Sequence, residues 1–103
     1  MRVTAILSAY PDGTVVAVVP ALPGCIGEGV GVEAALANTA EAVTVWLAEA
    51  QAVARAPLEE TPELIAEELY QVLADREEDG LPPLVETRQI EVDAAPPPPA
   101  PPL

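Results

Sequence analysis

Residues 2–19, RVTAILSAYPDGTVVAVV, combine two strand patterns with a turn between them. Apolar residues at every second position of residues 2–10 have the period of a strand with one buried face. The positions on that face are Val3, Ala5, Leu7 and Ala9. Residues 14–19 are almost all β-branched, which favours a second strand. Because Pro11-Asp12-Gly13 between them has the residue types of a tight turn, the sequence predicts a β-hairpin.

The chain after the hairpin predicts a third, short strand. Two prolines and Gly24 within residues 20–24 exclude a regular ladder there. Residues 25–30 are predicted as a strand, with Cys25 or Ile26 pointing inward and Glu28 near the surface. Because three glycines at 27, 29 and 31 weaken a strand, we expect this element to be short or bulged.

Residues 32–55 are the strongest helix pattern, because they are rich in Ala and Leu and contain no Pro or Gly. Their apolar stripe is Leu36, Ala40, Val43, Leu47, Ala50 and Ala54. Glu33 is expected in the first turn and Arg55 in the last, where both suit the helix dipole. Trp46 lies just off the stripe, which is typical of the margin of a core and, less often, of an interface.

A second helix is predicted over residues 62–79, where Thr61 provides the cap and Pro62 the first helical position. Its stripe is Ile65, Leu69 and Val72. Residues 57–79 hold nine acids and one Arg, a local charge of −8. Such a segment is either a solvated face or a surface for a basic partner.

The remaining residues predict a closing strand and a tail. Residues 84–92 alternate again and are assigned to a fourth strand, whereas 94–103 form a Pro-rich extended tail. The order is β-β-β-α-α-β. The sequence therefore predicts an α+β domain over residues 1–93, with a small antiparallel sheet of three to four strands and a helix packed on one face.

Composition excludes several classes of function. The chain has 103 residues, 17 acids against 4 Arg, a net charge of −13, no His and one Cys. Without His there is no imidazole base, and a lone Cys forms no intrachain disulfide or Cys₄ metal site. Strong negative charge opposes direct binding of nucleic acid. Since no apolar run approaches a membrane span and no signal peptide is recognisable, a cytoplasmic protein is expected.

Paired carboxylates are the chemistry that this composition leaves open. Glu41 and Glu49 lie two turns apart on the first helix, about 12 Å along its axis, which is too far to share a metal ion. The first strand carries no acid at all. We therefore expect no enzymatic activity, no catalytic residues, no metal and no cofactor; a relic of a metal-dependent hydrolase is the remaining enzymatic alternative.

Two segments resemble the HicB-like antitoxin family, the partners of HicA toxins that cleave mRNA. They are Pro20-x-Leu22-Pro23-Gly24-Cys25 and the stretch Ala-Leu-Ala-Asn-x-x-Glu-Ala over 35–42. The resemblance implies a degenerate ribonuclease-H-like fold without catalytic residues. It also implies a small basic toxin as partner, which the chain would neutralise without catalysis. Because that toxin depends on a His, this chain is not the toxin itself.

The chain departs from the family in two places. The helix-capping Asp-Thr or Asp-Ser of the family is replaced by Val30 and Gly31, so the cap is weaker. The closing strand leads into the Pro-rich tail instead of the usual C-terminal DNA-binding segment, so DNA binding is not expected.

Two functions remain open: the antitoxin-like module, and a solitary HicB-like scaffold or regulator without a toxin. Exposed edges of a small sheet favour a homodimer or larger homo-oligomer in both cases. The candidate partner-binding residues are Asp12, Pro23, Gly24, Glu28, Glu63, Glu67 and Glu68.

Overall fold

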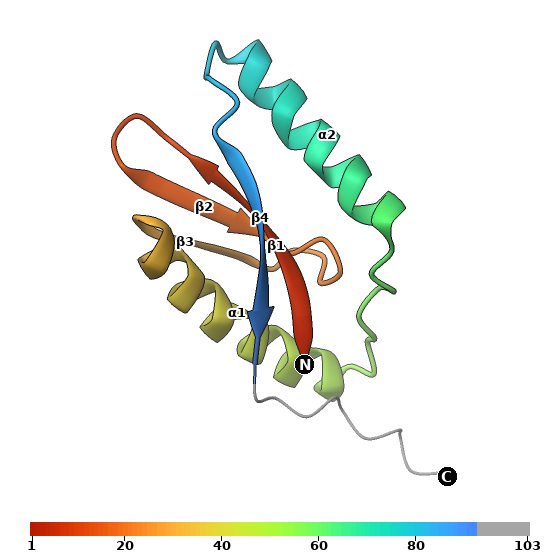
Figure 1. Cartoon of the computed structure of the whole chain (residues 1–103). Coiled ribbons are helices and arrows are strands. Elements are labelled where there is room, and N and C mark those ends of the chain that lie inside the picture. The colour runs from red at the N-terminus through yellow and green to blue at the C-terminus, as the bar shows by residue number, and fades with distance from the viewer. Residues whose placement is uncertain (93–103) are drawn as a thin grey trace, which may run out of the picture.

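A computed structural model describes residues 1–92, so the predicted tail at 94–103 lies outside the described residues. Four strands and two helices follow one another in the predicted order (Figure 1). They are β1 (Arg2–Ala9), β2 (Thr14–Val18), β3 (Ile26–Val30), α1 (Val32–Ala52), α2 (Pro62–Glu78) and β4 (Val85–Glu91). The α+β fold is confirmed, and each predicted element is present with ends shifted by at most three residues.

The four strands form one antiparallel sheet in the order β3-β2-β1-β4, so β3 and β4 are its edges. The predicted turn closes the β1–β2 hairpin: Gly13 has a φ of 92°, and the Thr14 amide donates to Asp12 Oδ1 at 2.9 Å. β3 pairs with β2 in five consecutive register positions, so of the two predicted forms, short or bulged, this strand is short and regular.

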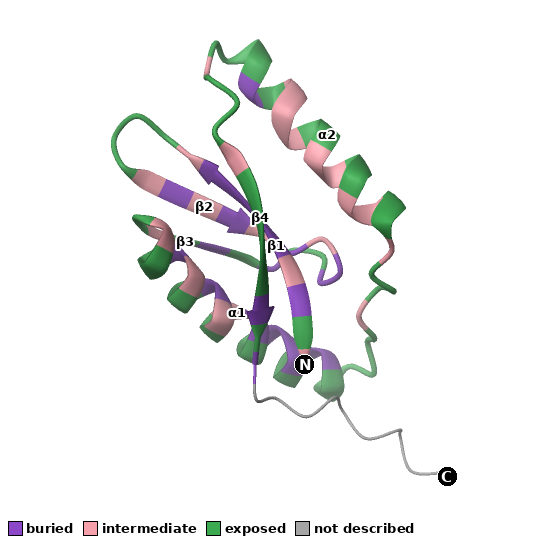
Figure 2. Ribbon diagram, viewed as in Figure 1, coloured by how far each residue is buried: buried purple, intermediate pink, exposed green. Residues whose placement is uncertain are grey.

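The hydrophobic core lies between one face of the sheet and α1, where buried residues are concentrated (Figure 2). The predicted face of β1 is part of it, because Val3, Ala5 and Leu7 are almost fully buried. α1 contributes Ala35, Val43, Trp46, Leu47 and Ala50. Ile90 and Val92 complete this core from the closing strand, as the alternation of 84–92 predicts.

The N-terminal half of α1 turns a different side to the sheet than predicted. Ala35 and Thr39 are fully buried, whereas Leu36 and Ala40 are only half-buried. The reason is that Gly27 and Gly29 present no side chain to the helix. An added Cβ on Gly27 would lie 2.7 Å from Thr39 Cα, and one on Gly29 would lie 2.7 Å from the Ala35 amide nitrogen. The small residues therefore face the sheet where the backbones approach most closely.

The end of α1 also differs from the prediction. The helix ends at Ala52, and Ala54 takes a φ of 54°, so Arg55 lies beyond the last turn. Its guanidinium instead stands over the Trp46 ring at 5.1 Å from the centroid. Trp46 is 9% exposed and its Nε1 donates to the Pro23 carbonyl at 2.9 Å, so it belongs to the core.

α2 crosses the face of the sheet opposite α1 (Figure 1). Thr61 caps it as predicted, since its hydroxyl accepts a hydrogen bond from the Leu64 amide at 3.1 Å. Its predicted apolar stripe, Ile65, Leu69 and Val72, is only half-buried, and Arg76 is its one buried residue. Because α2 buries so little of its surface, space remains between this helix and the sheet.

Candidate interaction surfaces

A groove separates the N-terminal half of α2 from the loop between β2 and β3. We call it the α2 groove; its volume is about 340 Å³. Its walls bring together three of the seven predicted partner-binding residues, namely Pro23, Gly24 and Glu68. Its apolar lining is Val18, Val19, Pro20, Cys25, Ile26, Leu58 and Leu64. The side chain of Ile26 is 58% exposed, so a large apolar group is accessible there.

The loop that forms one wall of the α2 groove is rigidly held. Leu22 is fully buried beneath it, and the Cys25 amide donates to the Leu22 carbonyl at 2.9 Å. Gly24 has a φ of 85°, which favours glycine at this position. The loop therefore presents Pro23 and Gly24, both exposed, above a buried leucine.

The acids of α2 do not form one uniform outward surface. Glu63 and Glu67 are exposed one turn apart, as predicted, but Glu68 is half-buried in the groove. Glu60 is also occupied, because it accepts the Thr4 amide at 2.6 Å and the Thr4 hydroxyl at 3.1 Å. β2 ends before it can pair with Thr4, so the Glu60 carboxylate takes the place of a strand there.

The other two predicted residues lie outside the α2 groove. Glu28 is exposed on β3, and Asn38 of α1 donates to its carbonyl oxygen at 2.7 Å. Asp12 lies at the tip of the hairpin, at the end of β2 away from the Pro23–Gly24 loop. Hydrogen bonds from the Thr14 amide, and then from its hydroxyl, lower the pKa of Asp12. This carboxylate is therefore a turn residue as well as a surface charge.

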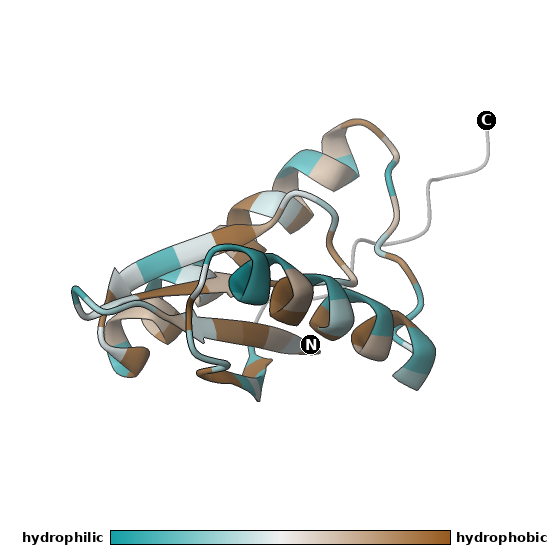
Figure 3. Cartoon of the chain, turned by 90° about the horizontal axis from the view of Figure 1, so that it is seen from above, coloured by the Kyte–Doolittle hydropathy of each residue, from teal (hydrophilic) through white to brown (hydrophobic). Residues whose placement is uncertain are grey.

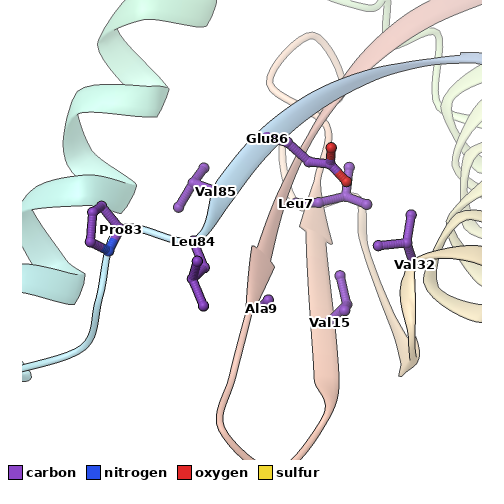
Figure 4. A pocket seen from close by; sticks show the side chains of 8 residues that line it. All are labelled: Leu7, Ala9, Val15, Val32, Pro83, Leu84, Val85 and Glu86. Atoms are coloured by element: carbon purple, nitrogen blue, oxygen red, sulfur yellow. The ribbon is translucent and has the colours of Figure 1, made fainter.

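A second hollow, of about 310 Å³, lies beside the start of β4 on the α1 side of the sheet (Figure 4). Val32 bounds it on one side and Leu84 on the other, over a floor that includes Ala9 and Val15. Leu84 is 58% exposed. The hollow exists because α1 crosses mainly β3 and β2, which leaves this corner of the sheet uncovered.

Sequence reasoning missed this hollow and the burial of Arg76, the one buried residue of α2. Both depend on how the helices lie on the sheet, and the sequence pattern of each element carries no such information. The available signal for the hollow was Leu84, an apolar residue directly after two prolines.

Within residues 1–92, no group of three or more His, Cys, Asp or Glu side chains is placed to hold a metal ion. Neither α1 nor α2 has the length and apolar character of a membrane-spanning helix. Seen from above, hydrophilic and hydrophobic residues alternate along the helices (Figure 3).

These features define a small α+β unit with apolar surface grooves and an acidic second helix. No protein-family model and no curated protein sequence matches the chain. Its fold is similar to that of a chain in a solved structure described as "HicA3 and HicB3 toxin-antitoxin complex". The TM-score is 0.60 at 15% sequence identity, and the match covers 91% of this chain and 100% of that chain.

Cys25 is expected to be chemically inert in the folded protein. It is 4% exposed, and burial raises the pKa of its thiol, so little thiolate forms near neutral pH. We expect alkylation at pH 8 to be at least about 100-fold slower than in urea, because exposure requires the groove wall to open. Timed iodoacetamide labelling followed by mass spectrometry measures both rates, and equal rates would contradict a buried thiol.

Proposed function

We propose that this chain is a non-catalytic, antitoxin-like module that binds and neutralises a small basic RNA-cleaving toxin of HicA type. The observation that carries the proposal is the similarity of its fold to a chain of a toxin–antitoxin complex. The net charge of −13 and the absence of His favour the antitoxin role over the toxin role, since the resemblance implies a basic, His-dependent toxin.

The proposed binding surface is the α2 groove together with the outer face of α2 beside it. Its apolar floor suits a hydrophobic anchor of the partner, because well-packed apolar anchors carry most interface energy. Glu63 and Glu67 are exposed and directly precede Leu64 and Glu68 of the groove wall in the sequence. Rim charges act mainly on the association rate and its salt dependence, and a basic partner would be attracted to them from a distance.

Changing Glu63 and Glu67 to Gln is expected to slow association about three- to tenfold at low salt, because two steering charges are lost. Adding Glu68→Gln tests the groove wall, where we expect faster dissociation as well. The partner for this test is a small basic protein encoded by a neighbouring reading frame. Stopped-flow measurements over a range of salt concentrations give both rates.

The matched control is Glu77→Gln with Glu78→Gln, which removes two exposed charges from the other end of the same helix. This pair should change the association rate less than the Glu63 and Glu67 pair does. Equal effects of the two pairs would show that association depends on the net charge of the chain and not on where the acids lie. If neither pair changes the association rate, the interface would instead lie at the hairpin around Asp12.

The second candidate function is a solitary homo-oligomeric scaffold or regulator without a toxin. The two edge strands of the sheet favour it, because natural proteins pair or cover such edges. A neighbouring reading frame without a basic, His-containing product would support this function over the first.

A further inference from the structure

The two edges of the sheet differ in how well they are protected. On β3 the outward backbone groups belong to Ile26, Glu28 and Val30, and the Asn38 amide covers the Glu28 carbonyl at 2.7 Å. β4 is longer, with seven residues against five. Within residues 1–92, no side chain donates to the outward carbonyls of β4. An uncovered edge of this length is a template for pairing with another strand.

The outward groups of β4 follow from its pairing with β1. Ala9 donates to the Leu84 carbonyl at 3.0 Å and Val92 to the Met1 carbonyl at 2.8 Å, so even-numbered residues of β4 point their backbone groups toward β1. Thr87 and Gln89 therefore point theirs away from the sheet. The Val85 amide is bonded to the Pro83 carbonyl at 3.0 Å, but no group of the described residues 1–92 donates to the Val85 carbonyl.

We infer that β4 pairs antiparallel with β4 of a second copy of this chain, with Thr87 of each copy opposite Thr87 of the other. This inference does not depend on toxin binding, since it concerns only how two copies associate. Two reciprocal bonds between the Thr87 residues, and one from each Gln89 amide to the Val85 carbonyl of the other copy, satisfy both outward groups of Thr87, the Gln89 amide and the Val85 carbonyl. The Val85 amide stays with Pro83.

Charge selects this register. With Thr87 on the two-fold axis, Glu86 of each copy lies opposite Arg88 of the other. Glu86 and Arg88 already form an ion pair within one chain at 3.4 Å, and both are exposed on the α1 side. The dimer then carries four alternating charges in a square. Moving the axis by one residue places Glu86 opposite Glu86 or Arg88 opposite Arg88, and like charges directly opposite destabilise a sheet.

Apolar residues extend the same register. Leu84 of one copy lies opposite Ile90 of the other, on the same face as the charge square. Leu84 is 58% exposed and borders the hollow beside β4, so the second copy would cover this apolar corner of the first (Figure 4). α2 lies over the other strands of the opposite face and leaves this edge open.

Charge reversal tests the register. We expect Glu86→Arg alone and Arg88→Glu alone each to weaken dimerisation at least about tenfold, since each places like charges opposite one another. An equal mixture of the two single variants should dimerise again, because each Arg then meets a Glu across the interface. Sedimentation equilibrium at increasing concentration measures the association of the two single variants and of their mixture. If these residues affected only the stability of the monomer, the mixture would not form a heterodimer.

The matched control is Glu28→Arg, the same charge reversal on the other edge strand, which should leave dimerisation unchanged. Thr87→Pro should abolish dimerisation, since proline removes an outward amide. At concentrations low enough for Thr87→Ala to be monomeric as well, the two variants should have similar thermal midpoints. A monomeric wild-type chain at high micromolar concentration overturns the inference. The inference is also overturned if the mixture stays monomeric while the wild type dimerises. It is overturned as well if Glu28→Arg breaks the dimer.

Discussion

Replacing Gly27 with Ala is expected to destabilise the protein by about 3 kcal/mol, although the same change in an open strand stabilises it by roughly 0.5–1 kcal/mol. The difference arises from α1. The new Cβ would lie 2.7 Å from Thr39 Cα and 2.8 Å from Thr39 N, and a helix backbone cannot rotate away as a side chain can. The helix must move off the sheet, which loosens the packing of Ala35 and Val43.

Urea denaturation of Gly27→Ala, with Glu28→Ala as the control on the exposed neighbour, measures this effect. The control should change the free energy of unfolding by less than about 0.5 kcal/mol. Combining Gly27→Ala with Thr39→Ala should recover only part of the lost stability, because it removes the contact with Thr39 Oγ1 but leaves those with the Cα and N of residue 39. An unchanged or more stable Gly27→Ala protein would mean that β3 and α1 are not in such close contact.

Gly27 also illustrates what the sequence of this protein predicts and what it does not. The glycines of residues 25–31 correctly predicted a short strand, but they were interpreted as a weakness. Their second role, in admitting a helix backbone, depends on both glycines facing α1, which is known only once the register with β2 is known. The hairpin and the Thr61 cap were predictable because their signals are local: a turn tripeptide, and a threonine before a proline.

The candidate surfaces were less predictable for the same reason. The charge density of residues 57–79 predicted either a solvated face or one acidic surface for a basic partner, but Glu60 is occupied by Thr4 and Glu68 faces the groove. A helical repeat indicates which residues share a side, and it does not indicate which part of the sheet that side covers. The meeting of Glu68 with Pro23 and Gly24 is therefore a result of the tertiary structure.

Arg76 is the residue on which the position of α2 most depends. It is 3% exposed, and its Nε donates to the Pro82 carbonyl at 2.8 Å while Nη2 donates to the Ala9 carbonyl at 2.6 Å. The guanidinium also lies 5.2 Å from the centroid of the Tyr10 ring. One side chain thus joins the end of α2 to the β1–β2 hairpin and to the turn before β4. The rest of the helix is only half-buried, so few other contacts share this role.

Changing Arg76 to Met is expected to cost about 3 kcal/mol and to lower the thermal midpoint by roughly 15 °C, because two charge-assisted bonds are lost and two carbonyls are left without these donors. Methionine keeps much of the aliphatic volume, so the loss reports on the guanidinium. Arg2→Met is the control: its ion pair with Glu91, at 3.6 Å, is exposed and worth at most about 1 kcal/mol.

Hydrogen exchange should show where the lost stability of Arg76→Met is located. We expect the amides of α2 to lose protection first, while those of α1 and the central strands keep most of theirs, since the core between α1 and the sheet contains no α2 residue. If α1 and α2 lose protection equally, Arg76 supports the whole domain. Protection lost from α2 alone would show that this arginine holds the helix, and with it the α2 groove, in place.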